Sequence, residues 1–183
     1  MLKARQTAIF AMLIAMIPLL SPAQSTLSPN NKSQQWRLAA INREWAAVTQ
    51  ENQAWECVKE SEQLKTAGYL NEADRVTKLM NSAAKLQQAG DLENKAARNF
   101  DAAVNNWKRV TTTQNKSSEN ADAVEARTHI DANTENALDA SYRAVGRYEL
   151  AAELYRSLGP AGANQASALS EKAAGCREAL ANR

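Results

Sequence analysis

The sequence predicts an all-α fold, either an antiparallel helical bundle or a short array of helical hairpins with five to six helices. Apolar residues recur at spacings of three and four along most of the chain, which is the period of an amphipathic helix. No segment has the alternating, β-branched pattern that is typical of a strand. Alanine supplies much of the 44% hydrophobic fraction, whereas aromatic residues make up 5%. This composition favours closely packed helices.

The N-terminal residues have the pattern of a secretory signal peptide. Lys3 and Arg5 precede an apolar run at 8–20, and small residues lead to a predicted cleavage after Ala23. A membrane anchor is the alternative, but the run is shorter than the roughly 20 residues that span a bilayer. We therefore expect residues 1–23 to be removed. The protein is then exported, periplasmic or extracellular, and is not an integral membrane protein after cleavage.

The charge balance of the remaining chain is neutral. Cleavage removes two of the 22 Lys and Arg residues and leaves 20, which equals the number of Asp and Glu residues. A neutral surface with interspersed charges gives no reason to expect nucleic acid as a partner. Residues 24–32 are polar and are predicted to be a flexible leader. Residues 33–183 are predicted to form a single all-helical domain, which is long enough for one continuous core.

A long first helix is predicted at 34–66, with Gly68 as its C-terminal stop. Ile41, Val48 and Trp55 recur every seven residues, as in a coiled coil, and mark one apolar stripe. A sugar-binding platform is an alternative role for the tryptophans of this helix. The shared stripe favours packing into the core instead.

Two further helices are predicted at 70–88 and 92–112, with Gly90 between them. Short connections at the glycines imply that successive helices are antiparallel neighbours. Residues 111–118 are polar and rich in Thr, Asn and Ser, which prefer turns to helix interiors. They are predicted to form a linker within the one domain, because neither side looks large enough to be stable alone.

The C-terminal part is predicted to form three helices, which are expected at 119–145, 150–158 and 163–181. The breaks between them are expected at Gly146 and at the Gly-Pro-Ala-Gly segment 159–162. The first of the three is the most polar helix of the chain, and Asp131 occupies a position in its apolar stripe. We expect Asp131 and Asn133 to face a protein partner instead of a core.

Glycine-led phrases begin at Gly68, Gly90 and Gly146. In each, an aromatic residue or a leucine follows the glycine closely, and in the last two, alanine and an aromatic residue then follow at helical spacing. This arrangement resembles the turn and second helix of tetratricopeptide-type (TPR-like) repeats. The resemblance implies an array of helical hairpins that holds peptide or protein partners in a groove.

The chain has only two cysteines, Cys57 and Cys176. An even count in an exported protein predicts a disulfide that ties the first helix to the last. The alternative is two separate buried thiols that behave as small hydrophobic residues. No Cys-x-x-Cys pair is present, so a redox enzyme is not expected.

The sequence has no recognisable set of catalytic residues. His129 is the only histidine, and with Asp131 and Glu135 it could lie on one helix face as a metal site. One histidine is few for zinc or copper, so a solvated polar face is the better interpretation. No phosphate-binding glycine loop or nucleophile elbow is present. We therefore expect no catalytic, cofactor or metal site, and a protein that is not an enzyme.

Two functional hypotheses follow. The first is an exported, non-enzymatic helical protein that acts as a protein–protein interaction scaffold or adaptor, or as an envelope component, with a protein partner or by self-association. The alternative is a periplasmic or secreted protein that binds a small hydrophobic ligand. Its apolar pocket between helices would be lined by Trp45, Trp55 and Trp107.

Overall fold

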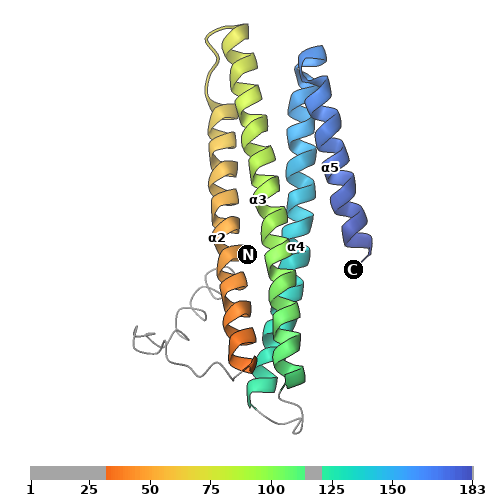
Figure 1. Cartoon of the computed structure of the whole chain (residues 1–183). Coiled ribbons are helices and arrows are strands. Elements are labelled where there is room, and N and C mark those ends of the chain that lie inside the picture. The colour runs from red at the N-terminus through yellow and green to blue at the C-terminus, as the bar shows by residue number, and fades with distance from the viewer. Residues whose placement is uncertain (1–31, 114–120, 183) are drawn as a thin grey trace. The chain divides into compact units, whose positions relative to one another are not determined.

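The computed structural model describes residues 32–113 and 121–182, and all the regular structure in them is helical (Figure 1). From Ser33 onward these residues belong to one compact unit, Ser33–Arg183. The elements are, in chain order, α2 (Lys32–Thr66), α3 (Glu72–Thr113), α4 (Ala121–Ser157), the short 3-10 helix η2 (Gly159–Gly162) and α5 (Ala163–Ala181). The predicted signal peptide, and the predicted leader up to residue 31, lie outside the described residues.

The all-α prediction is confirmed for the described residues, but the predicted number of helices is wrong. Four α-helices are present there instead of five or six, because α3 and α4 each continue through a glycine that was expected to end a helix. Residues 111–113 of the predicted linker also belong to α3. None of the helices in the described ranges has an apolar stretch long enough to cross a membrane.

The expected helix ends at Gly68 and at Gly159 are confirmed, whereas those at Gly90 and Gly146 are wrong. Gly159 has a φ of 67°, a left-handed conformation that glycine adopts without strain, so α4 ends just before it. Gly90 lies in the middle of α3, and Gly146 lies in the middle of α4. A glycine inside a helix costs only about 1 kcal/mol, which is less than the burial of the apolar residues on either side contributes.

Small residues repeat every seven positions where α2 meets α3. They are fully buried and comprise Ala40, Ala47, Ala54 and Ser61 on α2, and Ser82, Ala89, Ala96 and Ala103 on α3. The Oγ atoms of Ser61 and Ser82 lie 2.8 Å apart, which sets the antiparallel register. Seven residues before Ser61 and seven after Ser82, Ala54 and Ala89 belong to the same hydrophobic cluster. The two rows of small residues let the helix backbones approach closely.

The third long helix, α4, completes the core by packing on both α2 and α3. Ala137, Ala144 and Ala151 of α4 are spaced by seven residues and are fully buried. Phe100 of α3 packs in the same cluster as Ala137. Side chains also join α4 to α2, because both Oε atoms of Glu125 accept hydrogen bonds from Arg37, at 2.6 and 2.8 Å. Residues 32–113 and 121–157 therefore form a three-helix bundle.

The last helix, α5, packs against α4 through Ala166, Leu169 and Ala173 (Figure 1). The turn before it is tight, since a Cβ atom on Gly162 would lie 2.0 Å from the backbone oxygen of Tyr155. Only a residue without a side chain fits there. This close turn folds α5 back along the C-terminal half of α4.

The predicted Cys57–Cys176 disulfide is not formed in the structure, where both thiols are free. Cys57 lies on α2, and Cys176 lies on α5, which packs on α4. Cys57 is buried and Cys176 is half-buried beside the same hydrophobic cluster. Burial raises the pKa of both thiols. The alternative interpretation, two separate thiols that behave as small hydrophobic residues, is the one that the structure fits.

The two internal glycines have different environments, so replacing each by alanine should have opposite effects. A Cβ atom on Gly90 would lie 2.8 Å from Cε1 of Tyr148, whose buried ring is held by a hydrogen bond from its hydroxyl to Asp91. We expect Gly90→Ala to lower the free energy of unfolding by about 1–3 kcal/mol through overpacking. Urea denaturation followed by circular dichroism measures the change.

Gly146→Ala is the matched control, because no atom outside the neighbouring helix backbone lies within 4 Å of a Cβ atom at that position. Alanine should stabilise α4 there by up to about 1 kcal/mol, through its higher helix propensity. Destabilisation by both substitutions to the same extent would contradict the proposed packing of Tyr148 on Gly90.

Candidate protein-interaction surface

The residues predicted to face a partner lie on opposite sides of α4. Asp131 is exposed, whereas only 3% of Asn133 is exposed. Nδ2 of Asn133 donates a hydrogen bond to Oε1 of Glu44 at 2.6 Å, across the core from α2. The prediction that Asn133 faces a partner is therefore wrong, because its amide is needed inside the bundle by a buried carboxylate.

Glu44 is the centre of a buried polar layer between α2, α3 and α4. Its Oε1 also accepts a hydrogen bond from the indole Nε1 of Trp107 at 2.7 Å and lies 3.0 Å from Nδ1 of His129. The ring of Trp107 stacks on His129 with 4.4 Å between centroids. His129 thus lies against the core. The expectation that it belongs to a solvated polar face is wrong. We call Glu44, Trp107, His129 and Asn133 the first polar layer.

The charges in the first polar layer stabilise each other. Burial acts to raise the pKa of Glu44, but the hydrogen bond and charge of His129, together with the hydrogen bonds from Trp107 and Asn133, outweigh it and lower the pKa. The hydrogen bond to Glu44 in turn raises the pKa of His129, although burial opposes this. Each partner therefore favours the charged form of the other, and a charged Glu44 stabilises the fold.

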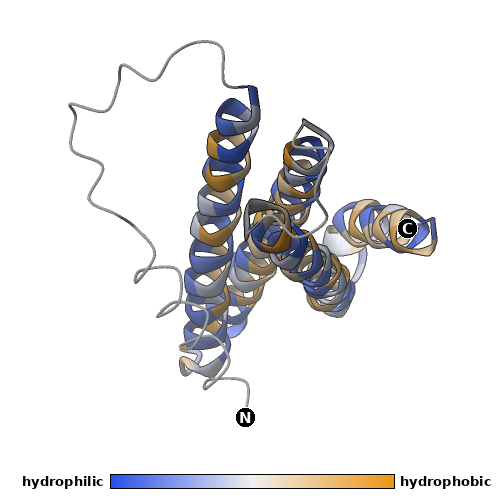
Figure 2. Ribbon diagram, turned by 90° about the horizontal axis from the view of Figure 1, so that it is seen from below, coloured by the Kyte–Doolittle hydropathy of each residue, from blue (hydrophilic) through white to orange (hydrophobic). Residues whose placement is uncertain are grey.

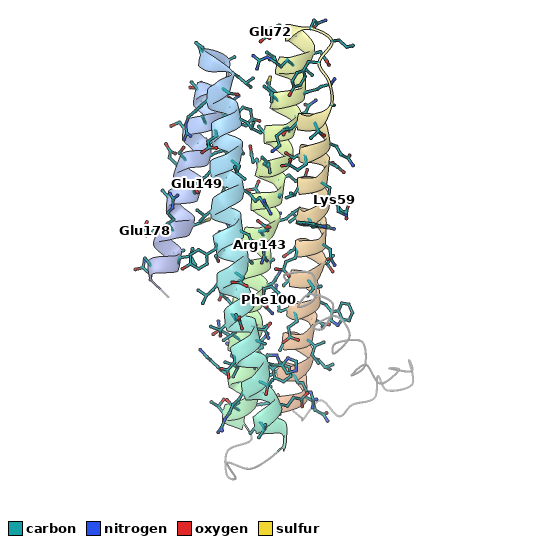
Figure 3. All side chains as sticks on the ribbon, turned by 180° about the vertical axis from the view of Figure 1, so that it is seen from behind. Lys59, Glu72, Phe100, Arg143, Glu149 and Glu178 are labelled. Atoms are coloured by element: carbon teal, nitrogen blue, oxygen red, sulfur yellow. The ribbon has the colours of Figure 1, made fainter. Side chains whose placement is uncertain are left out.

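A second polar layer lies seven residues further along α2. It consists of Glu51 on α2, Glu93 on α3, and Arg143 and Arg147 on α4. Arg143, near the middle of α4 (Figure 3), forms an ion pair with Glu51, and its Nε lies 3.4 Å from Oε1 of Glu93. Nε of Arg147 lies 3.8 Å from the same oxygen. The second layer thus joins all three long helices, as the first one does.

The second polar layer is less well satisfied than the first. Oε2 of Glu93 and Nε of Arg147 are buried and have no hydrogen-bond partner. Burial raises the pKa of Glu93 to about 7, even though Arg147 and Arg143 oppose the shift. Burial also raises the pKa of Glu51, against the charge of Arg143. The ionised form of Glu93 is therefore unfavourable in the folded protein.

Both polar layers are parts of the core. No group of three or more His, Cys, Asp and Glu residues within the described ranges is placed to hold a metal ion. A charged groove between α4 and α5 is lined by Glu149, Glu153, Arg156, Ser170, Ala173 and Arg177. Both of its arginines have partners within the groove, since Arg177 pairs with Glu149 and Arg156 donates a hydrogen bond to Ser170.

The three tryptophans predicted to line a pocket are separated between core and surface. Trp107 is buried with 1% of its surface exposed, whereas Trp45 and Trp55 have 42% and 53% exposed. The expectation that the tryptophans of α2 pack into the core is therefore wrong for Trp45 and Trp55, whereas Trp36, near the start of α2, is half-buried against a core cluster. From Ala40 to Ala54 the core side of α2 is occupied by alanines and by the buried Glu44, which leave no room for an indole beside the closely packed α3.

Trp45 and Trp55 belong to a second apolar face of α2, distinct from the one that forms the core. We define the outer face of α2 as Leu38, Ile41, Trp45, Val48, Asn52 and Trp55, which follow one another at spacings of three and four. Ile41 and Val48 are half-buried against the core, whereas Leu38 is exposed like the two tryptophans. Hydrophobic residues spaced along the length of α2 are visible in Figure 2.

The other exposed large apolar residues are more scattered. Tyr69, Leu70 and Met80 lie near the α2–α3 connection, and Val124, Tyr142 and Leu150 lie on α4. Single exposed apolar residues are normal on protein surfaces. The outer face of α2 differs from them because its members share one helix, one periodicity and two large aromatic rings.

Comparison of the chain with protein-family models, curated proteins and solved structures gave no match. What the protein does is therefore inferred from its own side chains.

The second polar layer predicts a pH-dependent gain of stability in Glu93→Gln. The pKa of Glu93 is raised from 4.5 to about 7, so the folded state binds the proton more tightly than the unfolded state, and stability falls as the pH rises between these values. At pH 8 the neutral amide should raise the free energy of unfolding by on the order of 2 kcal/mol. At pH 4.5 the two proteins should be nearly equal. Urea denaturation across this pH range measures the difference.

Glu44→Gln is the matched control with the opposite sign. The pKa of Glu44 is lowered, so its contribution is present above its ordinary value of 4.5 and is lost as the pH falls through its lower folded-state pKa. At pH 7 the substitution should destabilise the protein by about 1–3 kcal/mol, because buried donors lose a charged acceptor. The same response in both variants would contradict the difference between the two layers.

Proposed function

We propose that the protein is an exported, non-enzymatic helical protein that acts as a protein–protein interaction scaffold or envelope component, and that the outer face of α2 is its binding surface. The observation that carries the proposal is the exposure of Trp45 and Trp55, at 42% and 53%, on the same helix face as Leu38. The described helices α3, α4 and α5 leave these rings uncovered.

The physical basis of this proposal is the cost of leaving two indoles in water. Tryptophan buries about 150–250 Å² when it is fully enclosed, and it is enriched at protein interfaces because its ring is large and rigid. Residues at spacings of three and four on a helix are the anchors with which an amphipathic helix binds an apolar groove or another helix. The outer face of α2 has this pattern over Leu38, Ile41, Trp45 and Val48.

Packing of the inner face of α2 in the core fixes the orientation of its outer face, which is the proposed binding surface. The inner face of α2 is held by buried alanines and by Glu44 and Glu51, which interact with side chains of α4. A helix fixed in this way presents Trp45 and Trp55 in one orientation, so little conformational entropy is lost on binding. The scaffold role therefore requires no repeat array, and it stands without the TPR-like resemblance.

Export is the second part of the proposal. It is supported by the sequence pattern of residues 1–23, with its basic start, its short apolar run and its small residues before Ala23. An exported scaffold would meet its partners in the periplasm or outside the cell. The two free cysteines do not conflict with export, because neither is fully exposed.

The proposal predicts that Trp45→Ala/Trp55→Ala loses its partners in an affinity-capture experiment on the exported fraction. Both residues are about half exposed and lie outside the core clusters, so the double variant should keep its helical circular dichroism and melt within a few degrees of the wild type. Tyr142→Ala is the control, since this residue is exposed on α4, outside the binding surface. Unchanged capture by the double variant, or equal loss in both variants, would reject α2 as the surface.

A further inference from the structure

We propose that the outer face of α2 docks on the same face of a second copy of the chain, in an antiparallel arrangement that places Trp45 of one copy against Trp55 of the other. This inference rests on the proposed function, since it names the partner of the same surface. It follows from the spacing, the length and the charges of that face.

The spacing of the outer face is that of a coiled-coil seam. Its residues alternate at steps of three and four from Leu38 to Trp55, and the next step reaches Lys59. Apolar residues with a mean repeat of 3.5 lie along one line of a helix and pack against a helix that has the same repeat. At about 1.5 Å per residue the seam is roughly 30 Å long. A second copy supplies a seam of the same length and repeat.

The charges at the C-terminal end of the seam favour the antiparallel orientation. In a parallel pair, identical residues meet, so Lys59 would face Lys59 and Glu62 would face Glu62 of the other copy. Like charges directly opposite each other are destabilising. In an antiparallel pair these residues meet the other end of the seam, where Leu38 and Ile41 lie. There they meet no like charge, and each keeps its ion-pair partner within α2, Glu56 for Lys59 and Lys65 for Glu62.

One antiparallel register brings the tryptophans together. Antiparallel seams pair the two alternating sets of residues with each other, and here the sets contain Trp45 and Trp55 respectively. A two-fold axis at the height of Gln50 places Trp45 opposite Trp55 of the second copy, and Val48 opposite Asn52. Because the pairing is isologous, it occurs twice and closes the dimer without further growth. The four indoles then form two pairs, and the two rings of each pair shield one another from water.

The size of the seam predicts a weak dimer. A strip about 30 Å long and about 10 Å wide covers on the order of 300 Å² on each copy. Stable complexes bury about 1,200–2,000 Å² in total. We therefore expect a concentration-dependent equilibrium, with monomers at low micromolar concentration and dimers at hundreds of micromolar.

Sedimentation equilibrium of the purified protein between about 1 and 300 μM tests the proposal. The wild type and Tyr142→Ala should shift from monomer to dimer over this range, whereas Trp45→Ala/Trp55→Ala should remain monomeric with an unchanged circular dichroism spectrum. A wild type that stays monomeric throughout, or a double variant that still forms dimers, would overturn it. If the wild type is monomeric but captures another protein through Trp45 and Trp55, the second copy is rejected while the proposed binding surface stands.

Cysteine cross-linking tests the orientation separately. In the proposed register, Asn42 and Glu56 of the second copy flank the same side of the seam and are offset by only about 3 Å along it, whereas the two copies of either residue are about 20 Å apart, beyond the reach of a disulfide. We use Asn42→Cys and Glu56→Cys, each in a Cys57→Ala/Cys176→Ala background. Under mild oxidation only the mixture of the two variants should form a covalent dimer. A covalent dimer of either variant alone would establish a parallel pair and reject the antiparallel proposal.

Discussion

The close contact between α2 and α3 is the constraint on which the remaining structure depends. Where the row of small residues on α2 meets the row on α3, no large side chain has room between the two helices. Large core residues such as Phe100 and Trp107 are therefore found beside this contact, where α4 covers them. Along this row the inner face of α2 has no position for an indole, so Trp45 and Trp55 lie outside, whereas Trp36 packs against the core just before the row begins at Ala40.

Rows of alanine bring helices together but do not define a unique alignment. If α2 slid along α3 by seven residues, most alanines would meet alanines again. The polar layers do define one alignment. Glu44 can accept hydrogen bonds from Trp107 and Asn133 in one alignment only, because a shift of one seven-residue repeat moves the Glu44 carboxylate by about 10 Å. A buried carboxylate without those donors would cost several kcal/mol. We infer that the polar layers select the alignment that the small residues permit.

The parts of the fold that depend on local signals were predictable from the sequence. Helical periodicity, the end of α2 before Gly68 and the end of α4 before Gly159 all follow from neighbouring residues. The failures involve distant partners. The continuity of α3 at Gly90 is accompanied by close packing of Tyr148 from another helix on that glycine, and the burial of Asn133 reflects Glu44, 89 residues away. A polar stretch of helix looks the same in sequence whether it faces water or a buried carboxylate.

The distribution of indoles also gives the protein two kinds of optical reporter. Trp107, stacked on His129, lies in the core with the half-buried Trp36 in the same cluster, whereas Trp45 and Trp55 report on the surface of α2. Loss of the core would move the emission of Trp107 to longer wavelength, as water reaches it. Covering of the outer face would move the emission of Trp45 and Trp55 to shorter wavelength. Unfolding and docking thus change the fluorescence of the same chain in opposite directions, and no added label is needed to tell them apart.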